Sequence, residues 1–528
     1  MAIIWVNDVS SSAPAVQPKA PQVREKFGLA HWMSQVLEEC DRAEAEFAKD
    51  PVHDLRVALR RCRSMADGLM AIDPSPEWRR MKKAGKQLFS ALGNLRDAQV
   101  MTDWIEELSS PEDPVAKVLA TYAAAHEHGS KQSAQAALHH FDRKRWARWM
   151  DELPQRAICI PLGGPVFLHM ALERWDEAHE LHRRVLRSPS NAAWHRLRIA
   201  IKKFRYIVEN FLPALHDTWI DDLKKLQDYL GEVHDLDVLW TTAVNVSAFP
   251  DAEARQRWRT RILEERQHRI EKYREKMVGP ASLWQVWRKA LPQDDEIEAA
   301  AFARFRLWAG FLDPDPRHSQ RVCRLALQLY DRLLKASMIP RDREYDLRAV
   351  LRVAATLHEV GRSKGEPKHH KRGSRMIRRM ATPLGYEPKD LQLAAIVARY
   401  HRGALPATSQ KGFARLTPAQ QRRTLLLAGI LRLADSLDAN RDGKVTKLTV
   451  AKHDSSLVIT AAGYDPLGPS AARVAVARHP LEALYNLPVI VRSDLSDKVQ
   501  KISRTRSVPS NFKTQSKISG SRSAKKVV

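Results

Sequence analysis

One pattern of side chains occurs twice in this chain, and it constrains the fold more than any other feature. A histidine is followed by basic residues three, seven and ten positions later, first at His53, Arg56, Arg60 and Arg63 and again at His195, Arg198, Lys202 and Arg205. At about 100° per residue, these offsets place the four side chains within roughly 80° of arc on one helix face. Apolar residues fill the positions between them, so the sequence predicts two helices that each have a packed side and a cationic side.

Charge repulsion makes such a row unfavourable unless the charge has a use. Like charges three or four residues apart weaken an isolated helix by roughly 0.2–0.5 kcal/mol per pair. Guanidinium groups donate paired hydrogen bonds to phosphate oxygens, lysine supplies a mobile point charge, and a neutral histidine can donate one hydrogen bond. A single run of this kind is usually a solvated helix face, but the same spacing found twice indicates a surface that binds a polyanion.

A second shared element shows that the duplicated unit is larger than one helix. The segment L-G-N-L-R-D-A-Q-V around Gly93 matches L-G-E-V-H-D-L-D-V around Gly231, and a lysine precedes each glycine by seven residues, Lys86 and Lys224. The copies are 142 residues apart at the histidine and 138 residues apart at the glycine. A period this long indicates two duplicated helical bundles rather than a solenoid of short repeats.

These residues resemble a CHAD domain, the helical family named for its histidines. The resemblance is carried by V-H-D-L-R-V-A-L-R-R-C-R from Val52, W-H-R-L-R-I-A-I-K-K-F-R-Y from Trp194 and the two glycine segments, and it covers roughly residues 24–290. It implies two pseudo-symmetric four-helix bundles whose facing basic surfaces bind inorganic polyphosphate. One departure is Ala98-Gln99, where an acidic residue is more usual. The implied polyphosphate-binding residues are His53, Arg56, Arg60, Arg61, Arg63, Lys82, Lys86, Arg96, His195, Arg198, Lys202, Lys203, Arg205 and Lys224.

The charge of the whole chain agrees with a polyanionic partner. Lysine and arginine number 87 against 62 aspartates and glutamates, which gives a formal net charge of +25 over 528 residues. Such a field attracts polyanions in a salt-dependent way, and it does not distinguish polyphosphate from nucleic acid. Aromatic residues suited to base stacking are sparse in the two rows, and neither helix-turn-helix nor zinc-finger spacing is present, so nucleic acid is the weaker alternative.

From His318 onward, histidines and carboxylates follow a metal-binding order. This order resembles the HD-domain superfamily, and the resemblance implies one divalent metal site at His318, His358, Glu359 and Asp435 and a second at His369 and His401. Imidazole together with carboxylate suits Mg, Mn, Fe, Ni or Zn, which the sequence does not distinguish. Glu359 departs from the superfamily, which normally has aspartate at this position. The basic residues expected to line the pocket are Lys364, Lys368, Lys371, Arg372 and Arg402.

A closer resemblance is to the carboxy-terminal HD-like domain of the exopolyphosphatase and guanosine pentaphosphate phosphatase family. It is carried by L-H-E-V-G-R from Leu357, H-H-K-R-G-S-R-M-I from His369, R-Y-H-R-G, and L-R-L-A-D-S-L-D from Leu431. We expect none of the catalysis that the actin-like ATPase domains of that family perform, because their glycine-rich phosphate loops are not found in this sequence. Two roles stay open for this half: binding of a metal or of a phosphorylated ligand such as a nucleotide, and metal-dependent phosphohydrolysis of polyphosphate or a nucleotide.

The predicted fold class is mainly all-α, with duplicated four-helix bundles followed by an HD-like helical domain and a small β-containing tail. Residues 1–22 and the basic tail at 494–528 are expected to lack structure. Between them, we expect the CHAD-like domain at 23–292, with repeats at about 23–150 and 165–290, the HD-like helical domain at 293–450, and a small α/β tail at 451–493. The chain shows no secretion signal, and no stretch approaches about 18 consecutive apolar residues. We therefore expect a soluble cytoplasmic protein without a membrane partner, and association with polyphosphate granules is left open.

Overall fold

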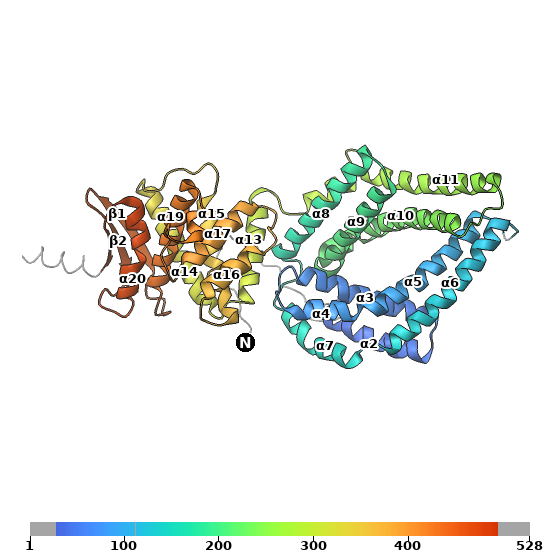
Figure 1. Cartoon of the computed structure of the whole chain (residues 1–528), viewed down its shortest axis with the longest axis horizontal. Coiled ribbons are helices and arrows are strands. Elements are labelled where there is room, and N and C mark those ends of the chain that lie inside the picture. The colour runs from blue at the N-terminus through green and yellow to red at the C-terminus, as the bar shows by residue number, and fades with distance from the viewer. Residues whose placement is uncertain (1–27, 111, 495–528) are drawn as a thin grey trace, which may run out of the picture. The chain divides into compact units, whose positions relative to one another are not determined.

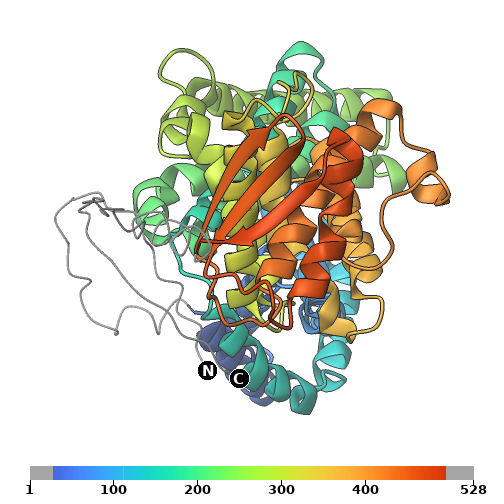
Figure 2. The ribbon, with the colours of Figure 1, turned by 90° about the vertical axis from the view of Figure 1, so that its left-hand side faces the viewer.

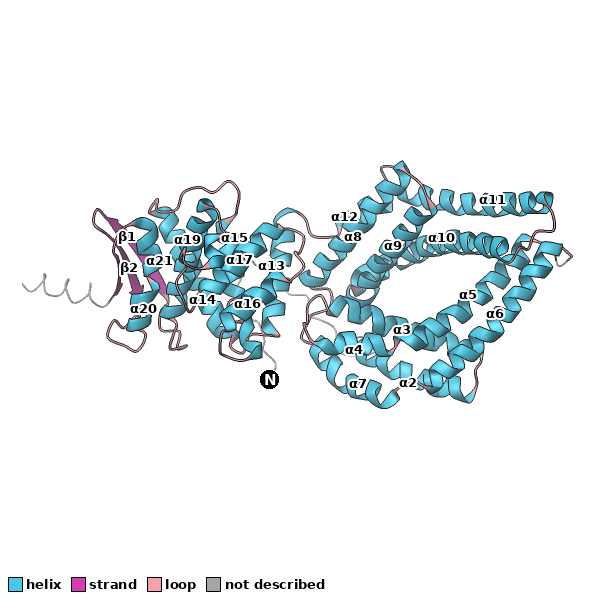
Figure 3. Cartoon of the chain, in the orientation of Figure 1, coloured by secondary structure: helices cyan, strands magenta, loops and turns pink. Residues whose placement is uncertain are grey.

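The computed structural model describes residues 28–110 and 112–494. The terminal segments predicted to lack structure, 1–22 and 494–528, lie outside these residues except for Asp494. The described chain is mainly helical, which confirms the predicted fold class, and its strands lie near the carboxy-terminal end (Figure 3). The chain divides into two compact units, residues 1–314 with 379–391 and residues 315–378 with 392–528.

The first unit contains two sets of helices that repeat one another. α3 and α9 have 21 residues each, and α6 and α11 have 26 residues each. The first set is α2 (Leu29–Ala45), α3 (Lys49–Leu69), α4 (Pro76–Ala84), α5 (Lys86–Leu108), α6 (Pro114–His139) and α7 (Arg143–Ala157). The second set is α8 (Pro165–Arg187), α9 (Asn191–Phe211), α10 (Pro213–Asn245), α11 (Ala252–Met277) and α12 (Leu283–Lys289), after which α13 (Asp294–Gly310) packs along α8.

Side chains that cap the helix starts explain where several of these helices begin. Asp113 and Asp251 accept hydrogen bonds from backbone amides in the first turns of α6 and α11. Ser190 accepts one from the amide of Ala193 at the start of α9. Such acceptors satisfy amides that have no partner within the helix. The position before α3 is Ala48, which has no side-chain acceptor.

The two sets of helices contact each other at two places. At the ends of α3 and α9, a Cβ atom on Gly68 would lie 2.4 Å from the ring of Phe211, so the glycine permits close packing. Away from this contact, α5 and α6 share an apolar cluster with α10 and α11 that includes Trp104, Leu236 and Trp258 (Figure 1). Contact at both places fixes the orientation of α3 relative to α9.

The second unit packs its helices around the buried α19 and covers them with a three-stranded sheet. β1 pairs antiparallel with β2, and β2 pairs parallel with β3, so that the strands lie side by side (Figure 2). The elements are α14 (Pro316–Lys335), α15 (Leu347–Leu357), η1 (Val360–Lys364), α16 (His369–Arg378), α17 (Pro388–Tyr400), α18 (Lys411–Ala414), α19 (Pro418–Leu437), β1 (Lys447–His453), β2 (Ser456–Ala462), α20 (Ala471–Ala477), α21 (His479–Tyr485) and β3 (Val489–Ser493). Within residues 28–110 and 112–494, no helix combines the length and the apolar character needed to cross a membrane.

Candidate functional site

The cationic sides of α3 and α9 face each other. Arg61 on α3 forms an ion pair with the carboxylate of Glu209 on α9. Lys202 on α9 lies close enough to Arg56 and Arg60 on α3 for the charges of these arginines to lower its pKa. The two rows predicted from the sequence therefore form one surface, to which both repeats contribute.

Part of the expected set of cations is held by neighbouring side chains. Arg61 and Arg205 both pair with Glu209, and Lys203 lies 3.2 Å from a carboxylate oxygen of Glu177. These pairs reduce the charge available to a ligand. Three further members of the set have partners: Arg63 donates to the carbonyl of Lys82, Lys82 pairs with Asp67, and Arg96 lies 3.9 Å from Asp103.

Four central cations make no ion pair with any carboxylate in the described part of the chain. They are Arg56, Arg60, Arg198 and Lys202, and we call them the cationic face. The Nε atoms of Arg56 and Arg60 are buried and have no hydrogen-bond acceptor within the described structure. The terminal guanidinium nitrogens of these two arginines, which form no ion pair in the described part of the chain, are the donors that a phosphate oxygen can reach.

Burial and mutual repulsion both act on the cationic face. Burial, followed by the charges of Arg198, Arg56 and Arg60, lowers the pKa of Lys202 to about 8. Burial also lowers the pKa of Arg56, although the nearby Asp97 opposes the shift. A bound polyanion would relieve this repulsion by placing negative charge between the two helices.

The remaining expected residues lie around the cationic face. His53 is exposed at the start of α3, and the ring of His195 lies 4.8 Å from that of His234. Lys86 and Lys224 are exposed on α5 and α10. These four side chains are therefore placed where they could contact a long ligand, rather than at its centre.

In the second unit, the structure brings together the six side chains that the sequence pattern selects. Asp315 accepts a hydrogen bond from the backbone amide of His318 at 3.2 Å, which fixes His318 in the first turn of α14. The others come from the ends of α15, α17 and α19 and from the start of α16. All six side chains are buried: His318, His358, Glu359, His369, His401 and Asp435.

A glycine determines how closely two of these segments approach. A Cβ atom on Gly361 would lie 2.1 Å from the carbonyl oxygen of His369 and 2.6 Å from the amide nitrogen of Gly373. Only glycine lets η1 pack this tightly against α16. The contact brings Nε2 of His369 to 3.1 Å from Oε1 of Glu359.

Each imidazole of the cluster is oriented through its Nδ1 atom. The Nδ1 atoms of His358, His369 and His401 lie 2.7, 3.0 and 2.7 Å from backbone carbonyl oxygens, to which a protonated Nδ1 donates. The Nδ1 atom of His318 lies 2.7 Å from Oδ2 of Asp438. The Nε2 atoms therefore face one another, as they do in histidines whose outer interactions orient them for metal binding.

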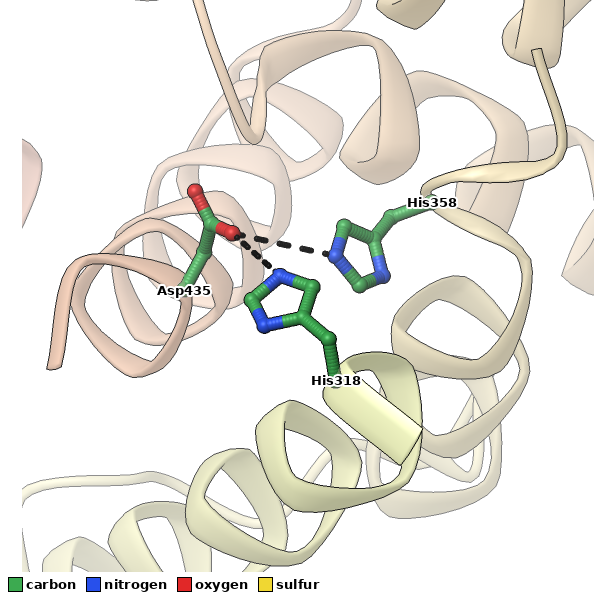
Figure 4. A group of neighbouring side chains, drawn as sticks. All are labelled: His318, His358 and Asp435. Atoms are coloured by element: carbon green, nitrogen blue, oxygen red, sulfur yellow. Dashed lines mark hydrogen bonds and ion pairs between the residues drawn. The ribbon is translucent and has the colours of Figure 1, made fainter. Parts of the chain in front are cut away.

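The inward atoms form two overlapping groups. The Nε2 atoms of His318 and His358 lie 3.1 and 3.9 Å from Oδ1 of Asp435 (Figure 4). His358 also belongs to a second group with Glu359 and His401, in which Oε1 of Glu359 lies 3.6 Å from Nε2 of His401. Glu359, which the sequence pattern assigns to the site of Asp435, thus lies with His401.

The donor atoms of the cluster fit a divalent cation. The Nε2 atom of His358 is buried and has no hydrogen-bond partner among the described residues. The Nε2 atoms of His369 and His401 lie 3.2 Å apart, and two lone pairs face each other at this distance only with a proton or a cation between them. Imidazole nitrogen and carboxylate oxygen are ligands of Zn, Mn, Fe or Ni, and carboxylate also suits Mg.

Arginines that the sequence pattern did not select hold the outer oxygens of the carboxylates. Arg362 and Arg441 lie 2.7 and 3.2 Å from Oε2 of Glu359, and Arg473 lies 3.2 Å from Oδ2 of Asp435. Arg362 follows Glu359 by three residues and could have been found from that spacing. Arg473 comes from α20 and has no such signal.

Two of the basic residues expected to line the pocket of the histidine and carboxylate cluster instead contact neighbouring segments of the chain. Arg372 donates hydrogen bonds to the backbone carbonyls of Gly361, Gly365 and Pro367, and Arg402 lies 3.1 Å from Glu366. These contacts stabilise the loop between η1 and α16. The positive charge beside Glu359 comes from other arginines instead.

The pKa values of two histidines of the cluster are shifted in opposite directions. Burial alone would lower the pKa of His318, but hydrogen bonds to Asp435 and Asp438 outweigh it and raise the pKa to about 9. Burial lowers the pKa of His358 to about 4. Near neutral pH, His358 is therefore neutral and presents a lone pair to the cluster.

Comparison with known proteins finds a similar family for each of two regions of the chain. Residues 29–244 match the model of the CHAD domain, and residues 311–461 match that of the Ppx/GppA phosphatase, domain III. A similar solved structure is the crystal structure of the CHAD domain from the plant Ricinus communis, with 19% identity, coverage of 50% of this chain and 90% of that chain, and a TM-score of 0.34. A search of curated proteins found no match. Residues 29–244 are therefore similar to a CHAD domain, and residues 311–461 to domain III of the Ppx/GppA phosphatase.

Proposed function

We propose that this protein binds inorganic polyphosphate on the cationic face. The observation that carries the proposal is the arrangement of Arg56, Arg60, Arg198 and Lys202, which come from two repeats, face one another and have no carboxylate partners among the described residues. A linear chain of phosphates offers closely spaced oxygens to such a row, and each charge-assisted hydrogen bond adds about 1.5–3 kcal/mol. The match to a CHAD domain supports the same ligand.

Charge reversal on both helices tests this proposal. Arg56→Glu with Arg198→Glu is expected to weaken polyphosphate binding roughly hundredfold, because two charge-assisted contacts are lost and two repulsive ones are added. The control is Arg255→Glu with Arg259→Glu, which makes the same change in net charge at two exposed positions of α11. Calorimetric titration of both variants measures the affinities. Equal losses in the two variants would show that bulk charge suffices and would overturn the proposal.

The choice between polyphosphate and nucleic acid needs a direct competition. At moderate salt, polyphosphate is expected to displace duplex DNA from the protein, because the aromatic side chains that base stacking uses are sparse in the two rows, where Tyr206 lies beside Lys202. A gel-shift competition measures this preference. Displacement of polyphosphate by DNA would make nucleic acid the ligand.

A second proposed function belongs to the histidine and carboxylate cluster, and it is favoured by the convergence of six buried ligand-type side chains. We propose that His318, His358 and Asp435 hold one divalent cation and that Glu359, His369 and His401 hold another. A bound metal would supply a polarised water or clamp a phosphoryl oxygen. The six side chains that would hold the metals are buried, and Arg441 and Arg473 hold the outer oxygens of Glu359 and Asp435 in place.

Metal analysis combined with a phosphatase assay tests this second function. Asp435→Ala is expected to reduce the bound divalent metal and to abolish phosphate release from polyphosphate or nucleotides, because it removes a carboxylate oxygen from the first group. Asp454→Ala, an exposed aspartate between β1 and β2, is the matched control. Equal metal content in both variants would exclude a metal site at Asp435. If the wild-type protein binds metal but releases no phosphate, the second unit is a binding domain rather than an enzyme.

A further inference from the structure

A pocket lies beside the cationic face in the first repeat, at the start of α3. Its volume is about 350 Å³, and it is bounded by the loop before α3 and by α3, α5 and α6. It shares Arg56 with the cationic face. Its basic side chains are those of Lys49, His53, Arg56, Arg96 and Lys131, and its carboxylates are those of Asp50 and Glu127.

The corresponding place in the second repeat holds a network of hydrogen bonds and ion pairs. With the offsets of 142 and 138 residues between the copies, Lys49 corresponds to Asn191, Gln99 to Asp237 and Lys131 to Arg269. Asn191 and Arg266 donate to Asp237 at 3.1 and 2.9 Å, and Arg266 also donates to Asn191 at 3.0 Å. Arg269 pairs with Glu232 and, at 2.8 Å, with Glu265.

Three differences between the repeats accompany the pocket of the first one. Gln99 stands in place of Asp237, Asn94 in place of Glu232 and Ala48 in place of Ser190. The first two remove carboxylates that hold basic side chains in the second repeat, and the third removes the side-chain cap of α3. Lys49 and Lys131 are consequently exposed, with no ion pair in the described part of the chain.

Glu127 and Asp50 do not close the first pocket in the same way. The carboxylate of Glu127 accepts a hydrogen bond from the amide of Gln99 at 3.3 Å, and Asp50 is exposed at the first turn of α3. Against these two carboxylates stand the cations Lys49, Arg56, Arg96 and Lys131, of which Arg96 also lies 3.9 Å from Asp103, and the uncapped amides at the positive end of the α3 dipole. The pocket therefore keeps a net positive charge that the second repeat has neutralised.

We propose that this pocket binds the terminal phosphate of a polyphosphate chain, an inference that rests on the proposed function of the cationic face. A terminal phosphate carries up to about one more negative charge near pH 7 than an internal one, because its second ionisation has a pKa of about 6. The row of α3, followed toward the start of the helix, leads into this pocket, whose lining includes Phe47 and Ala48. The end of the chain, rather than its middle, fits this position.

End-capped polyphosphate tests the inference. The wild-type protein is expected to bind chains with free ends about tenfold more tightly than chains of the same length whose two ends carry uncharged phosphoramidate caps, since one charge-assisted contact is at stake. Lys49→Gln with Lys131→Gln should bring this ratio close to one and leave the affinity for capped chains nearly unchanged. Asn94→Glu with Gln99→Asp, which installs the carboxylates of the second repeat, should do the same.

A matched control and the possible results separate this inference from the proposed function. Lys144→Gln with Lys276→Gln removes the same charge from exposed positions outside the pocket and should keep the preference for free ends. If the wild-type protein binds capped and free chains equally well, the end subsite is refuted. The cationic face remains supported in that case as long as Arg56→Glu with Arg198→Glu weakens the binding of capped and of free chains. If that reversal weakens neither, the proposed function fails.

Discussion

Lys202 shows how the environment of a single residue can tune binding of a polyanion. It is half-buried between α3 and α9, its ammonium lies 5.8 Å from the ring centre of Tyr206, and burial with neighbouring cations lowers its pKa to about 8. Below this pH the side chain is charged and can contact phosphate. Above it, the side chain loses its proton at a pH where lysines in solution keep theirs.

Polyphosphate affinity should therefore fall as the pH rises from about 7 to about 9. The bound polyanion favours the charged form of Lys202, so binding takes up protons near pH 8 and weakens once the side chain is neutral. The expected loss is about tenfold, the value of one charge-assisted contact. Lys202→Arg, which stays charged throughout, is the control, and calorimetric titrations across this pH range measure the affinities. An identical pH profile for the variant would contradict the role assigned to Lys202.

At the residue scale, Glu209 also shows why a predicted set of cations is larger than the set available to a ligand. Glu209 on α9 pairs with Arg205 on its own helix and with Arg61 on the opposite helix. The spacing of four residues to Arg205 is visible in the sequence, but the contact with Arg61 depends on how the two repeats pack. Only side chains without such partners remain able to bind phosphate.

At the scale of elements, the contact between η1 and α16 determines the geometry of the histidine cluster. Gly361 lets the backbone of η1 lie against the first turn of α16, which carries His369 toward Glu359. Both segments are short, so this contact, rather than helix propensity, fixes their relative position. The same contact makes the cluster sensitive to one added methyl group.

Gly361→Ala should destabilise the second unit by about 1–3 kcal/mol or more, because its Cβ atom would overlap backbone atoms that cannot move aside independently. Gly412→Ala on α18 is the control, since no atom lies within 4 Å of a Cβ atom there, and it should leave the unit as stable or slightly more stable. Thermal unfolding followed by circular dichroism measures both. Unchanged unfolding of the Gly361 variant would show that η1 and α16 are not packed as described.

The divergence of the repeats is also a property of elements. α3 and α9 have the same length and the same row of cations, but α9 has a serine cap and α3 does not. Together with the exchanges at Gln99 and Asn94, this difference leaves an open pocket in one repeat and a closed ion-pair network in the other. Duplication thus provided two similar surfaces, and a few substitutions gave them different roles.

At the scale of the whole molecule, the net charge of +25 and the cationic face act on different steps of binding. Long-range attraction by exposed charges accelerates encounter with a polyanion and is screened by salt. Buried, fixed donors act after the encounter and slow dissociation. The two contributions should therefore be separable by kinetics.

Arg255→Glu with Arg259→Glu should slow association with polyphosphate at low salt and leave dissociation nearly unchanged. Arg56→Glu with Arg198→Glu should instead accelerate dissociation roughly tenfold or more, because it removes contacts formed only in the complex. Surface plasmon resonance on immobilised polyphosphate at two salt concentrations measures both rates. A change confined to association in both variants would mean that no fixed site exists.

The sequence by itself determined the helical fold, the duplication, the two rows of cations and the order of the six buried cluster residues, because helix periodicity and repeated spacing are local properties of the chain. The tertiary structure alone decided which cations stay unpaired, since Arg61 finds its carboxylate in the other repeat. It also placed Glu359 with His401 and brought Arg473 to Asp435. Such pairings join residues far apart along the chain, and they depend on packing distances that no sequence spacing encodes.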